Sequence, residues 1–243
     1  MNSEKEFEYS VQLLADNFNE TGKLKPVSYL KMMQYVTECH LKKFNLNIDK
    51  MAYNNLAWVL ATIIVDIKNP PTGCDIIKGI TWHSDTSWPY FRREFKFFNE
   101  NGQEAFNAVS FSVLINLQKR CVLRRSNEID IGQGNKEFTI NDAKPVLRDI
   151  EEYDFIEKRK VYNSYIDILG HVNNTYYCDF AFDTLTEDEK LKDIKRININ
   201  FKSELRQGDV FSIYKGRDGN VTYFRGIREE DEKKSFSIAF TFA

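Results

Sequence analysis

The sequence predicts an α+β fold in which a helix followed by an antiparallel sheet occurs twice along the chain. Two observations lead to this prediction. Apolar residues at helical spacing precede a series of alternating strand segments, and the same order of elements returns in the second half. Short local features also recur at a separation of about 140–150 residues, which is too long for a solenoid repeat.

The length and charge of the chain limit the possible classes of protein. Its 243 residues can form one large domain or two small ones, with a substantial core in either case. A net charge of −2 argues against a dedicated nucleic-acid binder, because such proteins usually carry a strong basic excess. Basic pairs such as Lys42–Lys43 and Arg92–Arg93 are expected to be solvated surface, although they could form a patch for an acidic partner.

The first half begins with a predicted helix over Pro26–Phe44, and proline suits the first turn of a helix. One face of this helix is apolar and consists of Val27, Leu30, Met33, Val36, His40, Leu41 and Phe44. Three predicted strands follow, over Leu56–Ile67, Phe91–Phe98 and Ala105–Leu117. Asn101–Gly102 is typical of a hairpin turn between the last two strands.

The second half repeats this order with a predicted helix over Val172–Leu185. The predicted strands are Ile194–Phe201, Val210–Tyr214 and Ser235–Phe242. Asp16 and Gly22 precede the first helix as Asp167 and Gly170 precede the second. Gly73-Cys74-Asp75 follows the first central strand as Gly208-Asp209 follows the second. A long helix wrapped by a curved antiparallel sheet, present twice, predicts a tandem (double) hotdog fold with two long helices.

The predicted organisation has an N-terminal hotdog over residues 1–125, a linker over 126–157 and a C-terminal hotdog over 158–243 that carries the catalytic residues. The linker is polar and poorly periodic, with one short helix expected around Asn141–Tyr153.

Targeting and redox signals favour a cytoplasmic protein. The charged start Met1-Asn-Ser-Glu-Lys-Glu contains no apolar segment, so no signal peptide is expected. The longest apolar run, Leu56–Val65, is too short to span a membrane. The cysteines are far apart and fit reduced thiols better than disulfides or a zinc site. No metal or cofactor motif is found, so neither is expected.

The segment from Asp167 to Asn174 has the strongest functional signal in the chain. It places His171 at the start of the second predicted helix, shortly after the carboxylate of Asp167. A helix start presents unpaired N–H groups that can polarise a carbonyl and hold an oxyanion. Asn173 or Asn174 is a candidate cap for this helix. The competing interpretation is an ordinary loop histidine and a turn aspartate.

Glu204 follows the strand Ile194–Phe201, from where a carboxylate can face the helix start. Partial burial would raise its pKa toward values useful for a general base. The competing interpretation is a solvated charge cluster with Lys202 and Arg206. Cys178 lies among aromatic residues and is expected to be a buried structural thiol. Trp58 could line a cavity, but core packing is the more common role for such a residue.

At these residues the chain resembles the acyl-ACP thioesterases of plants and bacteria, over nearly its whole length. The supporting stretches are Asp16…Gly22-Lys-Leu24, Leu56-Ala-Trp-Val-Leu60, Arg92-Arg-Glu-Phe95, Val113-Leu-Ile-Asn-Leu117, Asp167…Gly-His-Val-Asn-Asn174 and Phe201-Lys-Ser-Glu204…Gly208-Asp209. The resemblance implies a tandem hotdog enzyme that hydrolyses the thioester between a fatty acyl chain and the phosphopantetheine arm of acyl carrier protein. It implies no cofactor, and no nucleic-acid partner or membrane span is expected.

The resemblance also implies that Asp167, His171 and Glu204 are the catalytic residues. The family usually has asparagine two residues before the histidine, and here that position is Leu169. Loss of an essential oxyanion donor would cost about 2.7–4 kcal/mol, or roughly 10²–10³ in rate. The cysteine sometimes found after the family's glutamate is Leu205 here, so a cysteine nucleophile at that position is excluded.

In the favoured mechanism Glu204 acts as general base on water. His171 orients that carboxylate or the water, and Asp167 holds His171 and its loop. The alternative is a nucleophilic Glu204 that forms an anhydride. Asn173 and Trp58 are the candidate substrate-binding residues, with the acyl chain between the N-terminal sheet and its helix. Two other functions stay open: hydrolysis of acyl-CoA, and binding of acyl thioesters without turnover. The sequence also leaves open the chain-length preference and whether the chain forms a homodimer.

Overall fold

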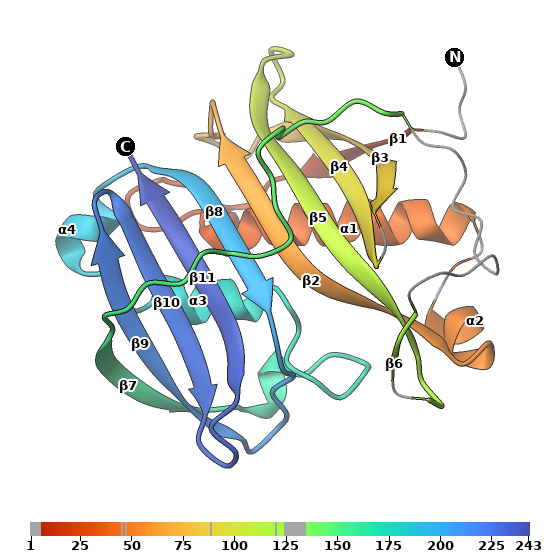
Figure 1. The fold of residues 1–243 in the computed structure, drawn as a ribbon. Coiled ribbons are helices and arrows are strands. Elements are labelled where there is room, and N and C mark those ends of the chain that lie inside the picture. The colour runs from red at the N-terminus through yellow and green to blue at the C-terminus, as the bar shows by residue number, and fades with distance from the viewer. Residues whose placement is uncertain (1–5, 45, 47, 88, 120, 124–134) are drawn as a thin grey trace. The chain divides into compact units, whose positions relative to one another are not determined.

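The chain forms two compact units, Met1–Pro145 and Val146–Ala243, each built from a helix and an antiparallel sheet (Figure 1). The computed structural model describes all residues except 1–5, 45, 47, 88, 120 and 124–134. None of the helices in this described part is long and apolar enough to cross a membrane.

The sheet of the first unit has the strand order β1-β3-β4-β5-β2, with β6 paired to β5. Its elements are β1 (Phe7–Gln12), η1 (Ala15–Asn17), α1 (Pro26–Lys43), α2 (Ile48–Tyr53), β2 (Leu56–Ile67), β3 (Ile76–Ser87), β4 (Tyr90–Phe98), β5 (Glu104–Asn116) and β6 (Cys121–Val122). The prediction of α1, β2, β4 and β5 is confirmed to within one residue at each end. Strands β1 and β3 were not predicted.

The helix α1 packs on one face of this sheet through buried side chains, among them Tyr29. Tyr29 meets Phe106 of β5 edge to face at 4.9 Å, and Phe106 stacks on Phe97 of β4 at 4.2 Å. Both phenylalanines are fully buried. The alternation expected for β4 is therefore confirmed, because its odd-numbered phenylalanines lie on the side of the helix.

The second unit repeats this architecture with the strand order β7-β9-β10-β11-β8. Its elements are β7 (Asp154–Lys160), η2 (Asn163–Tyr165), α3 (Tyr176–Phe182), α4 (Glu187–Lys190), β8 (Ile194–Phe201), β9 (Val210–Asp218), β10 (Val221–Arg228) and β11 (Lys234–Phe242). Aromatic contacts hold α3 to its sheet: Tyr177 to Phe236 at 5.3 Å and Phe180 to Phe211 at 5.0 Å.

The helix predicted over Val172–Leu185 is shorter than expected, so the prediction of two long helices is wrong for the second unit. Asn173 accepts hydrogen bonds from the amide and hydroxyl of Thr175, which delays the helix to Tyr176. Thr186 caps a separate helix, α4, through a capping box with Glu189. Side chains that bond to nearby backbone thus break one apolar pattern into two helices.

The described part of the predicted linker, residues 135–157, divides between the two units and covers their polar sheet faces. In the first unit, Thr139 donates from its amide and hydroxyl to Glu94, and Thr62 donates to the carbonyl of Pro145. In the second, the amide of Leu147 donates to Asn200. The helix expected around Asn141–Tyr153 is wrong, because this segment consists of turns, bends and irregular backbone and bonds to the sheets instead.

This covering segment also changes the environment of a basic residue. Arg92 is 8% exposed and pairs with the fully buried Glu94, which additionally accepts a hydrogen bond from Ser84 at 2.8 Å. A second nitrogen of Arg92 donates to the carbonyl of Ile140 at 2.7 Å. The expectation that Arg92 is solvated is therefore wrong, since the charge is buried and fully paired.

A buried histidine predicts how stability depends on pH. His40 of α1 is 4% exposed, and its Nδ1 lies 2.8 Å from Nη1 of Arg93. Burial, together with the charges of Arg93 and Lys43, lowers the pKa of His40 from 6.5 to about 3. Below pH 6.5 the unfolded chain therefore binds a proton that the folded protein rejects, and the free energy of unfolding falls as the pH falls.

Between pH 8 and pH 5, we expect the free energy of unfolding of His40→Gln to fall by about 2 kcal/mol less than that of the wild type. Urea unfolding followed by tryptophan fluorescence measures this, because the three tryptophans of the sequence all fall within residues 1–145, the range of the first unit. Parallel losses in both proteins would show that His40 does not couple folding to pH.

Candidate active site

The loop that carries His171 is a tight hairpin turn. Its two ends, Ile166 and Val172, are joined by an isolated antiparallel bridge. The amide of Asp167 donates to the carbonyl of His171 at 2.9 Å, and the amide of Gly170 donates back to Asp167 at 3.0 Å. Gly170 has φ +79°, a conformation that favours glycine. The glycine next to the histidine therefore allows the turn that presents the imidazole.

His171 and Glu204 meet directly. Nε2 of His171 lies 2.9 Å from Oε2 of Glu204, with side-chain exposures of 23% and 56%. The carboxylate is thus more exposed than expected, and its contact with the imidazole, rather than burial, distinguishes it from its neighbours. Nη2 of Arg206 is 3.9 Å from the same oxygen, so the competing interpretation of a charge cluster describes part of this environment.

Backbone contacts on both sides of the pair hold it together. The amide of Val172, next to His171, donates to the carbonyl of Leu205, next to Glu204, at 2.8 Å. The amide of Leu205 donates to the hydroxyl of Tyr177 on α3 at 3.2 Å. Burial raises the pKa of Tyr177 to about 12, so this hydroxyl stays protonated at neutral pH. Sequence reasoning missed this role of Tyr177, because a single sequence does not show the cross-loop contact.

Asp167 and Asn173 shape the loop. Oδ1 of Asp167 accepts the amide of Leu169 at 2.8 Å, and no hydrogen bond in the described structure joins its carboxylate to His171. The carboxamide oxygen of Asn173 accepts from the amide and hydroxyl of Thr175, which is itself the N-cap residue of α3, so the prediction that Asn173 or Asn174 caps this helix is wrong. Both side chains therefore bond locally in the turn and at the helix start.

Most amides at the start of α3 are already used. Val172 donates to Leu205, Asn173 to Tyr165, and Tyr176 to Asn173. Thr175 donates to the side chain of Asn173. Within Val172–Tyr176, whose residues are all described, only the amide of Asn174 lacks a protein acceptor. Asn174 is exposed, and its amide is the one backbone donor of these five described residues left for a ligand oxygen.

Trp58 belongs to the first unit, on β2. It is half-buried and lies edge-on to Phe91 at 4.6 Å, against a core cluster that includes Met51 and Leu114. Its indole nitrogen is buried without a hydrogen-bond partner in the described structure. Core packing explains the ring but leaves this donor unused.

The first unit contains the same loop without the same chemistry. Phe18 bridges to Leu24 as Ile166 bridges to Val172, 148 residues later. The carbonyl of Asp75 accepts the amide of Leu13 as that of Asp209 accepts the amide of Val161, which confirms the predicted duplication. In this correspondence Lys23 stands in place of His171.

The partner carboxylate is missing as well. Lys68 and Asn69 donate to Ala105 as Lys202 and Ser203 donate to Ser235, so Pro70 takes the place of Glu204. The imidazole–carboxylate pair therefore occurs in the second unit and has no counterpart at the equivalent place in the first.

Other reactive groups are poor candidates. Cys178 is fully buried, and burial raises the pKa of its thiol well above the usual value, as expected for a structural cysteine. Within the described residues, no three His, Cys, Asp or Glu side chains are grouped so as to hold a metal ion.

Comparison with protein families matches both halves of the chain. Residues 4–131 match the acyl-ACP thioesterase N-terminal domain, and residues 149–241 match the C-terminal domain. The chain belongs to the acyl-ACP thioesterase family. It is therefore a thioester hydrolase, and hydrolysis of acyl-ACP is the activity of its family. Comparison with curated proteins found no match.

Solved structures of the family have the same fold. An acyl-ACP thioesterase from Bacteroides thetaiotaomicron is 19% identical with a TM-score of 0.90, over 99% of this chain and 100% of that one. The 12:0-ACP thioesterase from Umbellularia californica is 17% identical with a TM-score of 0.85, over 98% and 97%. A putative oleoyl thioesterase from Lactobacillus plantarum is 16% identical with a TM-score of 0.82, over 99% and 97%. The predicted tandem hotdog fold is confirmed.

Proposed function

We propose that this acyl-ACP thioesterase uses Glu204 as a general base and His171 as its hydrogen-bonded partner. The observation that carries the proposal is the 2.9 Å contact between Nε2 of His171 and Oε2 of Glu204. The other oxygen of the carboxylate, Oε1, has no hydrogen bond from the described part of the chain. A carboxylate with one oxygen held and one oxygen available is suited to take a proton from water.

In the proposed reaction, Oε1 of Glu204 removes a proton from water as the water oxygen attacks the thioester carbonyl. The amide of Asn174 stabilises the developing oxyanion. The tetrahedral intermediate then collapses, the carbon–sulfur bond breaks, and the thiolate of phosphopantetheine leaves. His171 transfers a proton to this thiolate. Glu204 then passes to His171 the proton that it removed from water. The products are a free fatty acid and the carrier's thiol.

Leu169 stands where the family usually has asparagine, and its side chain is 55% exposed. Its methyl groups cannot donate a hydrogen bond to the oxyanion. In the proposal, Asn174 supplies the donor from the opposite end of the same loop. The absence of the asparagine is also the observation that favours the second candidate function, binding of acyl thioesters without turnover.

Trp58 is proposed to contact substrate in the first unit. The indole N–H lacks a partner among the described residues although it is buried, and a buried unused donor is costly. An acyl chain lying against the ring and its neighbour Phe91 would bury further apolar surface.

The same chemistry is proposed to take place in the cytoplasm. All four cysteines, Cys39, Cys74, Cys121 and Cys178, are free thiols, and Cys74 and Cys121 are exposed. Exposed free thiols suit a reducing compartment.

Thiol release by the purified protein tests the function. We expect multiple turnovers on acyl-ACP and slower turnover on acyl-CoA with the same acyl chain, measured at equal concentrations across several chain lengths. Faster turnover on acyl-CoA than on acyl-ACP would mean that coenzyme A, rather than acyl carrier protein, carries the acyl chain. Tight binding of acyl-ACP without release of thiol over hours would favour the second candidate, and Leu169→Asn would then be expected to restore turnover.

A further inference from the structure

A charged network around Arg228 fixes the backbone of Glu204. Nη1 of Arg228, the last residue of β10, donates to the carbonyl oxygen of Glu204 at 2.9 Å. The Arg228 side chain is 17% exposed, although its hydrogen bond to Glu204 lies at the surface. From this geometry we infer that Arg228 is a positioning residue, which holds Glu204 against His171.

The guanidinium of Arg228 is itself held in place. Nε and Nη2 donate to the two oxygens of Asp231 at 2.8 and 2.6 Å, a bidentate arrangement. Hydrogen bonds from Arg228 and Lys233 lower the pKa of Asp231, so its carboxylate is charged at neutral pH. With Nε and Nη2 bound to Asp231, Nη1 of Arg228 points at the turn that carries Glu204.

That turn is fastened at its other end by the same network. Oδ2 of Asp209 accepts the amide of Arg206 at 2.8 Å and lies 3.8 Å from Nη1 of Arg228. Asp209 is also the residue whose carbonyl accepts the amide of Val161. Arg228 therefore links the 229–233 turn to the 204–209 turn, and the carbonyl of Glu204 lies at their junction.

Different residues therefore hold the two backbone positions next to the catalytic pair. Val172 and Tyr177 hold the backbone of Leu205, and Arg228 holds the carbonyl of Glu204. Glu204 is more than half exposed, so its own packing does not fix its position. Without Arg228, the carboxylate would spend less time at hydrogen-bond distance from Nε2 of His171. Misplacement of a reacting group by about 1 Å can cost about 10²-fold in rate.

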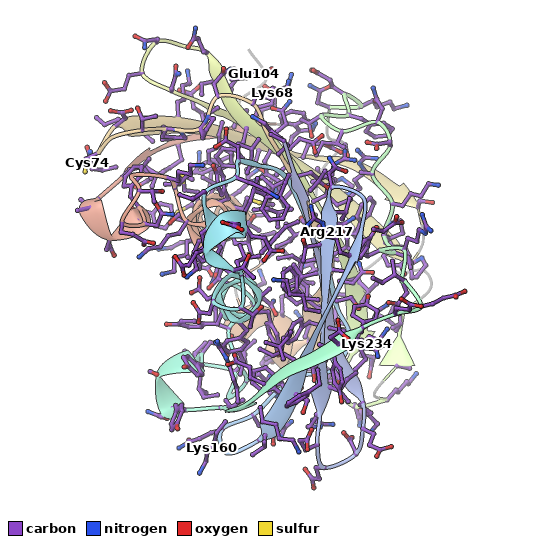
Figure 2. The ribbon with its side chains drawn as sticks, turned by 90° about the vertical axis from the view of Figure 1, so that its left-hand side faces the viewer. Lys68, Cys74, Glu104, Lys160, Arg217 and Lys234 are labelled. Atoms are coloured by element: carbon purple, nitrogen blue, oxygen red, sulfur yellow. The ribbon has the colours of Figure 1, made fainter. Side chains whose placement is uncertain are left out.

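The test compares Arg228→Met with Arg228→Lys and with a matched control, Arg217→Met. Arg217 (labelled in Figure 2) also donates to a backbone carbonyl, that of Gly219, but lies far along β9 from the site. We expect Arg228→Met to lower kcat by about 10- to 100-fold with little change in KM. Arg228→Lys should recover part of this loss, because lysine keeps a charged donor, and Arg217→Met should leave kcat unchanged.

Two further readouts separate positioning from a general loss of stability. Because Arg228 acts through Glu204, the double variant Arg228→Met/Glu204→Gln should be no slower than Glu204→Gln alone. In the free enzyme, the NMR signal of the His171 side chain should move in Arg228→Met toward its position in Glu204→Gln. Additive rate losses with an unmoved His171 signal would overturn the inference.

The kinetic part of this inference rests on the proposed function, whereas the NMR part does not. Full activity of Glu204→Gln would refute the proposed role of the carboxylate, and the His171 signal of Arg228→Met would still decide whether Arg228 positions Glu204. An unmoved signal together with unchanged kcat in Arg228→Met would refute the positioning role alone.

Discussion

Glu204→Gln is expected to lower kcat for thioester hydrolysis by about 10²–10⁴-fold, with little change in KM. The amide has the shape of the carboxylate and its oxygen can still accept the hydrogen bond from Nε2 of His171. It cannot take a proton from water, so the loss reports the general base rather than the geometry. Release of thiol from acyl-ACP, corrected for the free cysteines of the protein, measures the effect.

The matched control is Glu151→Gln, an exposed carboxylate in the same unit that lies outside the proposed site. Its kcat should equal that of the wild type. His171→Gln should also be slow, and the double variant with Glu204→Gln should be hardly slower than the worse single variant, since the two residues act as one unit. Wild-type rates in both single variants would remove the pair from the mechanism.

The alternative in which Glu204 attacks the thioester is distinguished by isotope labelling. When Glu204 acts as general base, a single turnover in ¹⁸O-labelled water places the label in the fatty acid and none in the protein. Label found in the carboxylate of Glu204 after one turnover would establish an anhydride intermediate.

Glu94→Ala is expected to have the largest effect on stability, a loss of about 3–5 kcal/mol in the free energy of unfolding of the first unit. Glu94 is fully buried and accepts hydrogen bonds from Arg92, Ser84 and Thr139. Its removal leaves the guanidinium of Arg92 buried without its carboxylate. It also detaches the covering segment at Thr139 from the sheet.

Glu104→Ala is the matched control, because Glu104 lies on the neighbouring strand and pairs with Lys68 at the surface (Figure 2). An exposed ion pair contributes about 0–1 kcal/mol. Urea unfolding followed by tryptophan fluorescence compares the two, and Trp82 reports on the affected face because its indole donates to the carbonyl of Glu137. Equal midpoints for both variants would contradict the prediction.

Short-range patterns predicted most of the fold. The apolar stripe of α1, the β-branched run of β2 and the alternation in β4, β5 and β8 were visible because each element buries apolar residues in a core. The second helix was predicted too long, since the apolar pattern does not show that Asn173 and Thr186 bond to local backbone. Strand β3 was missed, because its neighbours β1 and β4, rather than its own pattern, make it part of a sheet.

The site was predicted in part as well. The Asp167–Asn174 segment and Glu204 were singled out from residue types and from the resemblance to a family, and the structure places His171 in contact with Glu204. Tyr177 and Arg228 were not identified, because each acts on the backbone of a residue distant in sequence. Arg92 was expected at the surface, and nothing in its own strand indicates that residues 137–145 cover it.

The amino-acid sequence by itself determined the first helix and most of the central strands, that the architecture is duplicated, and which loop holds the imidazole. These depend on interactions between residues close together along the chain. The tertiary structure alone decided that Glu204 touches His171, that Arg228 holds Glu204, and that Glu94 is buried. Such contacts depend on how distant segments fold onto one another, and pairing over long separations leaves no periodic trace in the sequence.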